Sequence, residues 1–223
     1  MALILNIETS TKTCSVNLSK DGILLDYREI TNEKYVHSEK LHSLIQETFK
    51  SLSVEFQELN AVAVCSGPGS FTGLRIGVAS AKGIAFALGI PLISMNSIKI
   101  MIESFKPESV NKNAILFPMI DARRQEVYTA GFNSEKKQLT DISCPEINEN
   151  FITKYGKYEE LLFLGEGALK FKNMFKKSPV LIIDEPLNSS RGMALFTFKK
   201  FSKKEFENLS YFNPFYLKDF IPG

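Results

Sequence analysis

The stretch Gly-Pro-Gly-Ser-Phe-Thr-Gly-Leu-Arg-Ile-Gly, residues 67–77, decides the fold that we expect for this chain. It follows the apolar run Ala61–Cys65, which is typical of a buried strand. It opens a helical stretch from about Thr72 to Leu88, and Gly89 is a normal residue for ending a helix. The sequence therefore predicts a strand, a glycine-rich turn and a helix N-terminus in succession.

Such a turn can bind an anion, because free backbone N–H groups and the helix dipole point into it. The glycine spacing, however, fits neither the Walker A loop nor the dinucleotide fingerprint. Phosphate binding by this turn is the alternative to a purely structural role. We expect the structural role, with the loop formed by Gly67, Gly69, Phe71 and Thr72.

The helix after the turn carries a ladder of small residues. Gly73, Gly77, Ala81 and Ala85 recur every four residues, so they share one face and let another backbone approach closely. The covering layer could be a helix of the same domain or a partner subunit. We expect a partner interface made of Gly73, Gly77, Ala81, Ala85, Arg75 and His37, so that Gly77→Leu should disrupt pairing and leave the monomer folded.

The order of expected elements over residues 1–105 is three strands, a helix, a strand, a helix, a strand and a short helix. This order is typical of one lobe of the actin/sugar-kinase/Hsp70 (ASKHA) architecture, an α/β fold with a mixed sheet and helices on both faces. A polar stretch at 106–113 marks a lobe boundary. We expect a C-terminal lobe over 106–205 and an aromatic tail, 206–223, that docks back on the body.

The composition of the 223-residue chain is that of an ordinary globular protein and indicates no special class of partner. A hydrophobic content of 44% is ordinary for a globular protein, and a net charge of +2 requires neither nucleic acid nor membrane. Three widely spaced cysteines indicate reduced thiols, and the N-terminus lacks the pattern of a signal peptide. We expect a cytoplasmic protein without a membrane partner.

Metal and catalytic residues are scarce. His37 and His42 lie five residues apart, which places them about 140° apart on a helix and predicts no shared metal site. Glu8-Thr9-Ser10 ends the first strand, where the fold places a phosphate or metal hairpin. It lacks the glycine of such hairpins, so a capped strand end is the favoured interpretation. We predict no catalytic residue and no metal ligand in this chain.

Two groups of lysines form basic faces, which are either solvated helix surfaces or tRNA contacts. They are Lys170, Lys172, Lys176, Lys177, Lys199, Lys200, Lys203 and Lys204.

Five segments of the chain resemble the TsaB family, also called YeaZ, of bacterial tRNA threonylcarbamoyladenosine biosynthesis proteins. They are Ile4–Ser10, His37–Glu39, Ser66–Gly77, Asp121–Tyr128 and Pro214–Leu217. The resemblance implies two ASKHA lobes with a reduced C-terminal lobe. It also implies a non-catalytic scaffold, a degenerate relative of the transferase TsaD, which carries a His-x-x-x-His metal motif.

The same resemblance implies that the chain pairs with the catalytic subunit TsaD and with the ATPase TsaE. A homodimer through the N-terminal lobe is a further implied state. The complex uses ATP, whereas this chain alone requires no cofactor. The complex binds tRNA, and this chain contacts tRNA only indirectly. Whether a nucleotide binds this chain stays open. The alternatives are a glycoprotease-like metallopeptidase of the same superfamily and an ASKHA small-molecule kinase.

Overall fold

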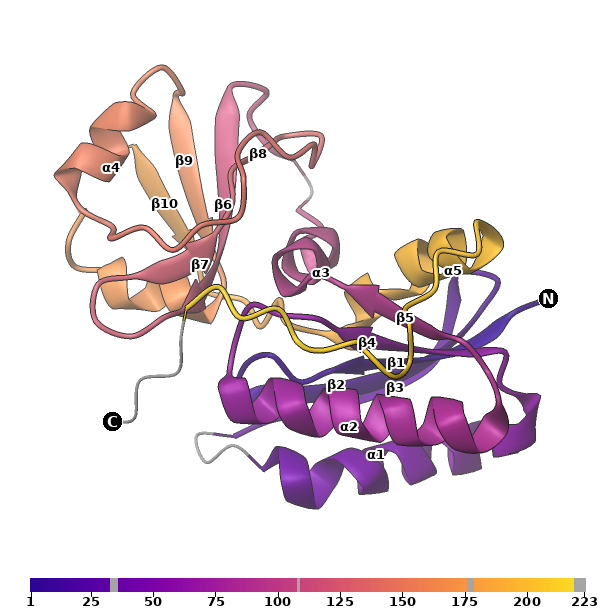
Figure 1. Cartoon of the computed structure of the whole chain (residues 1–223). Coiled ribbons are helices and arrows are strands. Elements are labelled where there is room, and N and C mark those ends of the chain that lie inside the picture. Colours follow the sequence, from indigo (N-terminus) through magenta and orange to yellow (C-terminus); the bar gives the residue numbers. More distant parts are fainter. Residues whose placement is uncertain (33–35, 108, 176–178, 219–223) are drawn as a thin grey trace. The chain divides into compact units, whose positions relative to one another are not determined.

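The computed structural model describes residues 1–32, 36–107, 109–175 and 179–218 (Figure 1). By their contacts the residues divide into two compact units. Unit 1 comprises Met1–Ile100 together with Asn188–Gly223, and unit 2 comprises Met101–Leu187. The division falls within helix α3 (Ser97–Ser104).

A five-stranded mixed sheet with the order β3-β2-β1-β4-β5 forms the centre of unit 1. Strand β2 pairs antiparallel with both β1 and β3, whereas β4 and β5 continue the sheet in parallel. Strands β1 and β4 are buried along their whole length, which explains their nearly continuous apolar sequences. The strands are β1 (Leu3–Glu8), β2 (Thr13–Lys20), β3 (Ile23–Thr31), β4 (Ala61–Cys65) and β5 (Leu92–Met95).

Helices cover both faces of this sheet, as the sequence predicts for the fold class (Figure 1). Helices α1 (His37–Leu52) and α2 (Phe71–Leu88) lie side by side on one face, with the short η1 (Phe56–Glu58) after α1. Helix α5 (Ala194–Ser202) and the turn η3 (Ser190–Gly192) pack on the other face. The order of elements through α3 is the predicted order.

The face of the sheet under η3 and α5 is lined by polar side chains. The Asn6 amide donates to Asn17 Oδ1 at 2.8 Å, and the Thr197 hydroxyl donates to Asn6 Oδ1 at 2.8 Å. The Asn17 amide donates to the Ser190 carbonyl oxygen at 2.5 Å. All four side chains are buried, so each hydrogen bond compensates for lost hydration. We call this set the polar seam.

The observed boundary between the two units differs from the predicted domain boundary on the C-terminal side. The sequence predicts a C-terminal lobe that extends to residue 205, whereas Asn188–Ser202 belong to unit 1 because the polar seam binds them to β1 and β2. The boundary near residue 105 differs by only a few residues from the observed one. Residues 206–218 of the predicted tail fall in unit 1, and residues 219–223 lie outside the described part.

Unit 2 is smaller and is built on a sheet of order β10-β9-β6-β7, with β8 paired to β6. Its core is aromatic: Phe117 contacts the rings of Phe151, Tyr155 and Phe163 at centroid distances of 5.1, 4.9 and 5.9 Å. The elements are β6 (Ala114–Asp121), β7 (Val127–Thr129), β8 (Phe132–Asn133), α4 (Glu149–Lys154), β9 (Glu160–Leu164), η2 (Glu166–Phe171) and β10 (Val180–Ile183).

Candidate partner-binding surface on helix α2

Helix α2 presents three stripes with different surroundings. The inner stripe is the small-residue ladder Gly73, Gly77, Ala81 and Ala85. The cationic stripe is Arg75 and Lys82, two turns apart. The outer stripe consists of Thr72, Ile76, Ala79, Gly83 and Phe86. Ser70 caps the helix by accepting a hydrogen bond from the Gly73 N–H at 3.2 Å, and Gly89 ends it in the left-handed conformation.

The inner stripe packs within unit 1. A Cβ atom on Gly73 would lie 2.2 Å from the Thr9 carbonyl oxygen, and one on Gly77 would lie 2.2 Å from Thr9 Oγ1. Ala81 and Ala85 are completely buried. The prediction that this ladder forms a partner interface is therefore wrong, because the segment after β1 and other residues of unit 1 already cover it. For the same reason Gly77→Leu should disrupt the monomer itself.

The glycines of the loop pack closely against the backbone of two other segments of the same chain. Gly69 faces the Ser10 carbonyl oxygen, 2.3 Å from the site of a Cβ atom, and that oxygen also accepts the Ser70 N–H at 2.7 Å. Gly67 has a φ of +99°, and a Cβ atom there would lie 2.6 Å from the Phe215 carbonyl oxygen. The segment after β1 and the C-terminal tail thus occupy the space beside this turn. These contacts give the glycines a packing role.

Glu8 is the last residue of β1, and its carboxyl group is completely buried. Its Oε1 accepts the Ser10 N–H at 2.6 Å, whereas Oε2 has no hydrogen-bond partner among the described residues. Burial raises the pKa of Glu8 to about 7, against the lowering effect of the hydrogen bonds from Ser10. Within the described ranges, no group of three or more His, Cys, Asp or Glu side chains is placed to hold a metal ion.

The two histidines of α1 lie in different environments, as their five-residue spacing predicts. His37 is buried, with Nε2 3.3 Å from the Thr13 carbonyl oxygen, and burial lowers its pKa. The prediction that His37 belongs to a partner interface is therefore wrong. His42 is exposed, and its Nε2 lies 3.3 Å from Ser80 Oγ of α2.

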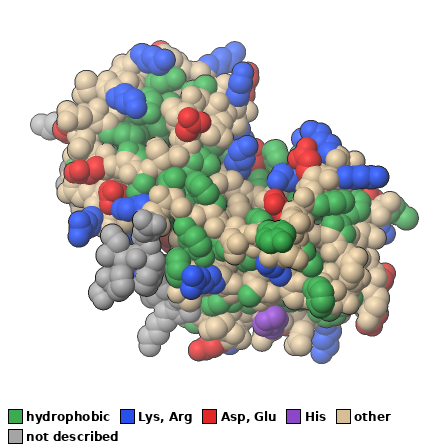
Figure 2. All heavy atoms as spheres, viewed as in Figure 1, with side chains coloured by type: hydrophobic (Ala, Val, Ile, Leu, Met, Phe, Trp, Pro, Cys, Tyr) green, Lys and Arg blue, Asp and Glu red, His purple; other side chains and the backbone are tan. Residues whose placement is uncertain are grey.

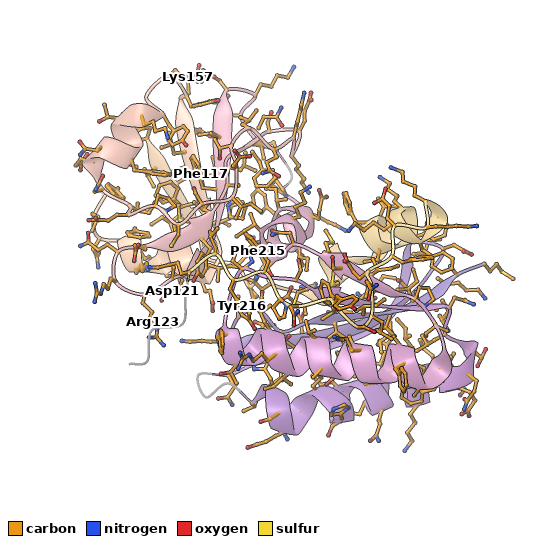
Figure 3. All side chains as sticks on the ribbon, viewed as in Figure 1. Phe117, Asp121, Arg123, Lys157, Phe215 and Tyr216 are labelled. Atoms are coloured by element: carbon orange, nitrogen blue, oxygen red, sulfur yellow. The ribbon has the colours of Figure 1, made fainter. Side chains whose placement is uncertain are left out.

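The cationic stripe binds the C-terminal tail. The Arg75 guanidinium lies 3.9 Å from the centre of the Phe71 ring, and its Nε donates to the Tyr216 hydroxyl at 3.3 Å. The Tyr216 ring packs on Phe71 with a centroid distance of 4.7 Å, and Figure 3 shows it beside the first turn of α2. Lys82 donates to the carbonyl oxygen of Phe212 at 3.1 Å. The sequence predicts that the tail docks on the body but does not indicate where, and in the structure these residues of the tail lie against the cationic stripe.

The outer stripe faces away from the sheet. Thr72, Ala79, Gly83 and Phe86 are exposed, with 79% of the Phe86 surface accessible, and Ile76 is half-buried. A Cβ atom on Gly83 would meet no atom within 4 Å. Figure 2 shows hydrophobic side chains at the surface over α2, beside a histidine. By length and composition alone α2 could also cross a membrane, a property shared by core helices of soluble proteins.

The spacing of the outer stripe is informative. Its five residues follow one another at intervals of four, three, four and three. An average of 3.5 residues is the repeat that keeps one seam facing a second helix. Small residues within such a seam allow close approach of the partner backbone. The outer stripe is therefore suited to receiving a helix.

The predicted basic faces are partly used inside the structure. Lys170 forms an ion pair of 2.6 Å with Asp121, which also accepts the Arg123 N–H at 2.8 Å. Lys200 donates to the Ser94 carbonyl oxygen at 2.9 Å. These contacts favour a structural role for both lysines over a tRNA contact. Lys176 and Lys177 lie outside the described residues.

Comparisons with known proteins agree with the resemblance noted in the sequence. The family model of TsaD, tRNA N6-adenosine threonylcarbamoyltransferase, matches residues 31–215. The chain is 32% identical over 137 residues to the tRNA threonylcarbamoyladenosine biosynthesis protein TsaB of Buchnera aphidicola subsp. Acyrthosiphon pisum. That alignment covers 61% of this chain and 60% of the relative. The TsaB of Buchnera aphidicola subsp. Baizongia pistaciae is 30% identical over 97% of this chain and 98% of its own length.

Among solved structures, the chain is similar to YeaZ from Pseudomonas aeruginosa. The TM-score is 0.76 at 22% sequence identity, over 97% of this chain and 100% of that one. At this identity the similarity supports the fold alone. It confirms the predicted ASKHA-like architecture of two α/β lobes with mixed sheets.

Proposed function

Because the chain belongs to the TsaB family of tRNA threonylcarbamoyladenosine biosynthesis proteins, we propose that it is the non-catalytic scaffold subunit of the complex that makes this modification. In this proposal it pairs with the catalytic subunit TsaD through the outer stripe of α2. The observation that carries the proposal is that the outer stripe of α2 is exposed and suited to receiving a helix, whereas the inner stripe of the same helix is already fully packed.

The contacts around β1 support the non-catalytic part of the proposal. Thr9 and Ser10 lie against Gly73 and Gly69, which leaves their backbones in the space where a phosphate would approach the turn. His37 is buried against Thr13, and His42 points to Ser80, so the two imidazoles do not converge. Such an arrangement favours binding and support over group transfer.

The match to the TsaD family model supports the identity of the partner. Two chains built on the same fold present equivalent helices, and equivalent helices can meet across an approximate two-fold axis. A seam with a 3.5-residue repeat suits this arrangement because each chain supplies one or two of the packed helices. The same stripe would also support a homodimer, in which case TsaD and a second copy compete for it.

The remaining parts of the proposal follow from the family. TsaE joins the complex, ATP is used by the complex, and this chain meets tRNA only indirectly. The chain acts in the cytoplasm and requires no cofactor or metal of its own. The metallopeptidase and kinase alternatives would be favoured by one tightly bound zinc ion per chain or by micromolar ATP binding to the isolated protein.

Reconstitution of tRNA modification with and without this chain tests the proposal. We expect modification by TsaD and its other partners to require the chain, and we expect Phe86→Asp to reduce both co-purification with TsaD and modification. The matched control is Leu195→Asp, since Leu195 is an exposed apolar residue on α5, on the opposite face of the sheet. Undiminished modification without the chain would contradict the proposal.

A further inference from the structure

The tail of unit 1 runs along α2 and is held at both ends of its path. Lys82 binds the carbonyl oxygens of Ser210 and Phe212 at 3.4 and 3.1 Å. Two turns nearer the start of the helix, Arg75 donates to the Tyr216 hydroxyl. Between these points the Phe215 N–H donates to the Ser66 carbonyl oxygen at 2.7 Å. The tail is therefore an ordered part of this surface.

The end of the tail leaves aromatic surface exposed. Phe215 and Tyr216 retain 46% and 37% of their accessible surface, although both are anchored through their backbone or ring edge. Arg75 stacks on Phe71 and touches Tyr216, so these side chains form one fixed group. Tyrosine and arginine held in this way are the residue types that most often dominate binding energy at protein interfaces.

This aromatic group adjoins the outer stripe. Thr72 of the stripe lies between Phe71 and Arg75 in the first turn of α2, and Ala79 follows Arg75 by one turn. A partner helix that follows the outer stripe toward the start of α2 would therefore reach the ring of Tyr216. The tail extends the apolar surface beyond the end of the helix.

We propose that residues 209–217 of the tail form part of the docking surface for TsaD, with Tyr216 as the main contact. This inference rests on the proposed pairing with TsaD and adds a second segment, far from α2 in the sequence, to the interface. Arg75 acts as a positioning residue, because it holds the Tyr216 ring against Phe71.

The test compares two tyrosines of equal exposure. Tyr216→Ala is expected to weaken TsaD binding by about 30-fold or more, the range of an interface hot spot. The control is Tyr27→Ala. Tyr27 is also 37% exposed and also contacts an arginine, Arg191, which lies 4.9 Å from its ring centre, but it faces η3 on the other side of the sheet. Tyr216→Phe keeps the ring and should bind within about threefold of the wild type.

A photo-crosslinking amino acid, p-benzoylphenylalanine, placed at position 216 or 27 reports the contact directly and does not depend on an affinity change. We expect a crosslink to TsaD from position 216 and none from position 27. Circular dichroism of each variant shows whether the fold is kept. If wild-type protein binds TsaD, but Tyr216→Ala binds equally well and position 216 gives no crosslink, the inference about the tail is overturned and the proposed pairing with TsaD stands. If wild-type protein does not bind TsaD, the proposed function fails and the inference fails with it.

Discussion

Gly77 and Gly83 lie on the same helix, yet their surroundings have nothing in common. A Cβ atom on Gly77 would lie 2.2 Å from Thr9 Oγ1, whereas one on Gly83 would meet no atom within 4 Å. The first glycine is explained by the folded monomer, because only a hydrogen atom fits there. The second weakens the helix by about 1 kcal/mol relative to alanine without any gain inside the chain. The contrast teaches that the inner stripe of α2 serves folding, whereas the outer stripe requires an explanation outside the monomer.

The largest effect should come from adding one methyl group to the inner stripe. Gly73→Ala places a Cβ atom 2.2 Å from a backbone oxygen of Thr9, which cannot rotate away as a side chain can. We expect a loss of about 3 kcal/mol or more in the free energy of unfolding, measured by urea denaturation. A stability equal to that of the wild type would show that α2 can shift away from β1, and the distinction between the stripes would weaken.

The segment that covers the inner stripe should also make stability depend on pH. The pKa of Glu8 is about 7 in the folded chain and about 4.5 in the unfolded chain, so the folded state holds the proton more tightly. Stability is therefore greatest below pH 4.5 as far as this group is concerned, and it falls as pH rises through 7. We expect a difference on the order of 2–3 kcal/mol between pH 5 and pH 8, measured by denaturation at each pH.

Glu8→Gln is the control for this pH dependence, since it keeps the shape and cannot ionise. The stability profiles of wild type and variant should run together below about pH 4.5, diverge as the pH rises from there, and run parallel again above about pH 7. Profiles that stay parallel between these two pH values would show that Glu8 does not titrate in this range.

On the outer stripe a charge should affect association and leave the fold intact. Phe86→Asp changes a side chain that is 79% exposed, so the free energy of unfolding should change by no more than about 0.5 kcal/mol. Binding to TsaD should weaken by at least about 30-fold, or about 2 kcal/mol, because a carboxylate would be buried in the seam. Isothermal titration calorimetry measures the binding. Unfolding of this variant, or unchanged affinity, would remove the basis for assigning the outer stripe to a partner.

The smallest effect is expected at the other glycine of the comparison. Gly83→Ala should stabilise the isolated chain by roughly 0.5–1 kcal/mol, because alanine is the better helix former and its Cβ has open space. In thermal unfolding the melting temperature should rise. A modest loss of affinity for TsaD alongside this gain would indicate that a partner backbone approaches Gly83 closely.

Much of unit 1 could be predicted from the sequence because its signals are local. The apolar run before Gly67, the small-residue ladder and the histidine spacing each predict one element or one angle. The ladder shows which residues share a face, but not what lies against that face. For this reason the assignment of Gly73, Gly77, Ala81 and Ala85 to a partner was wrong.

The contacts that were missed join segments far apart in the chain. Tyr216 and Arg75 are separated by 141 residues, and Thr197 and Asn6 by 191. No periodicity within either segment reports such a pairing. The 3.5-residue spacing of Thr72, Ile76, Ala79, Gly83 and Phe86 was present in the sequence, and it could have identified the outer stripe had it been compared with the ladder.

The polar seam has a consequence for synthesis on the ribosome. Strands β1 and β2 are made first, but Asn188–Ser202, which cover them, follow only after all of residues 101–187. At a typical elongation rate the delay is on the order of ten seconds. During that time the sheet face that carries Asn6 and Asn17 meets water, and its amides and hydroxyls can hydrogen-bond to the solvent. A face lined by leucines in the same place would expose apolar surface to other chains for the same time. The polar side chains of this face therefore keep the nascent first lobe from aggregating before α5 is synthesised.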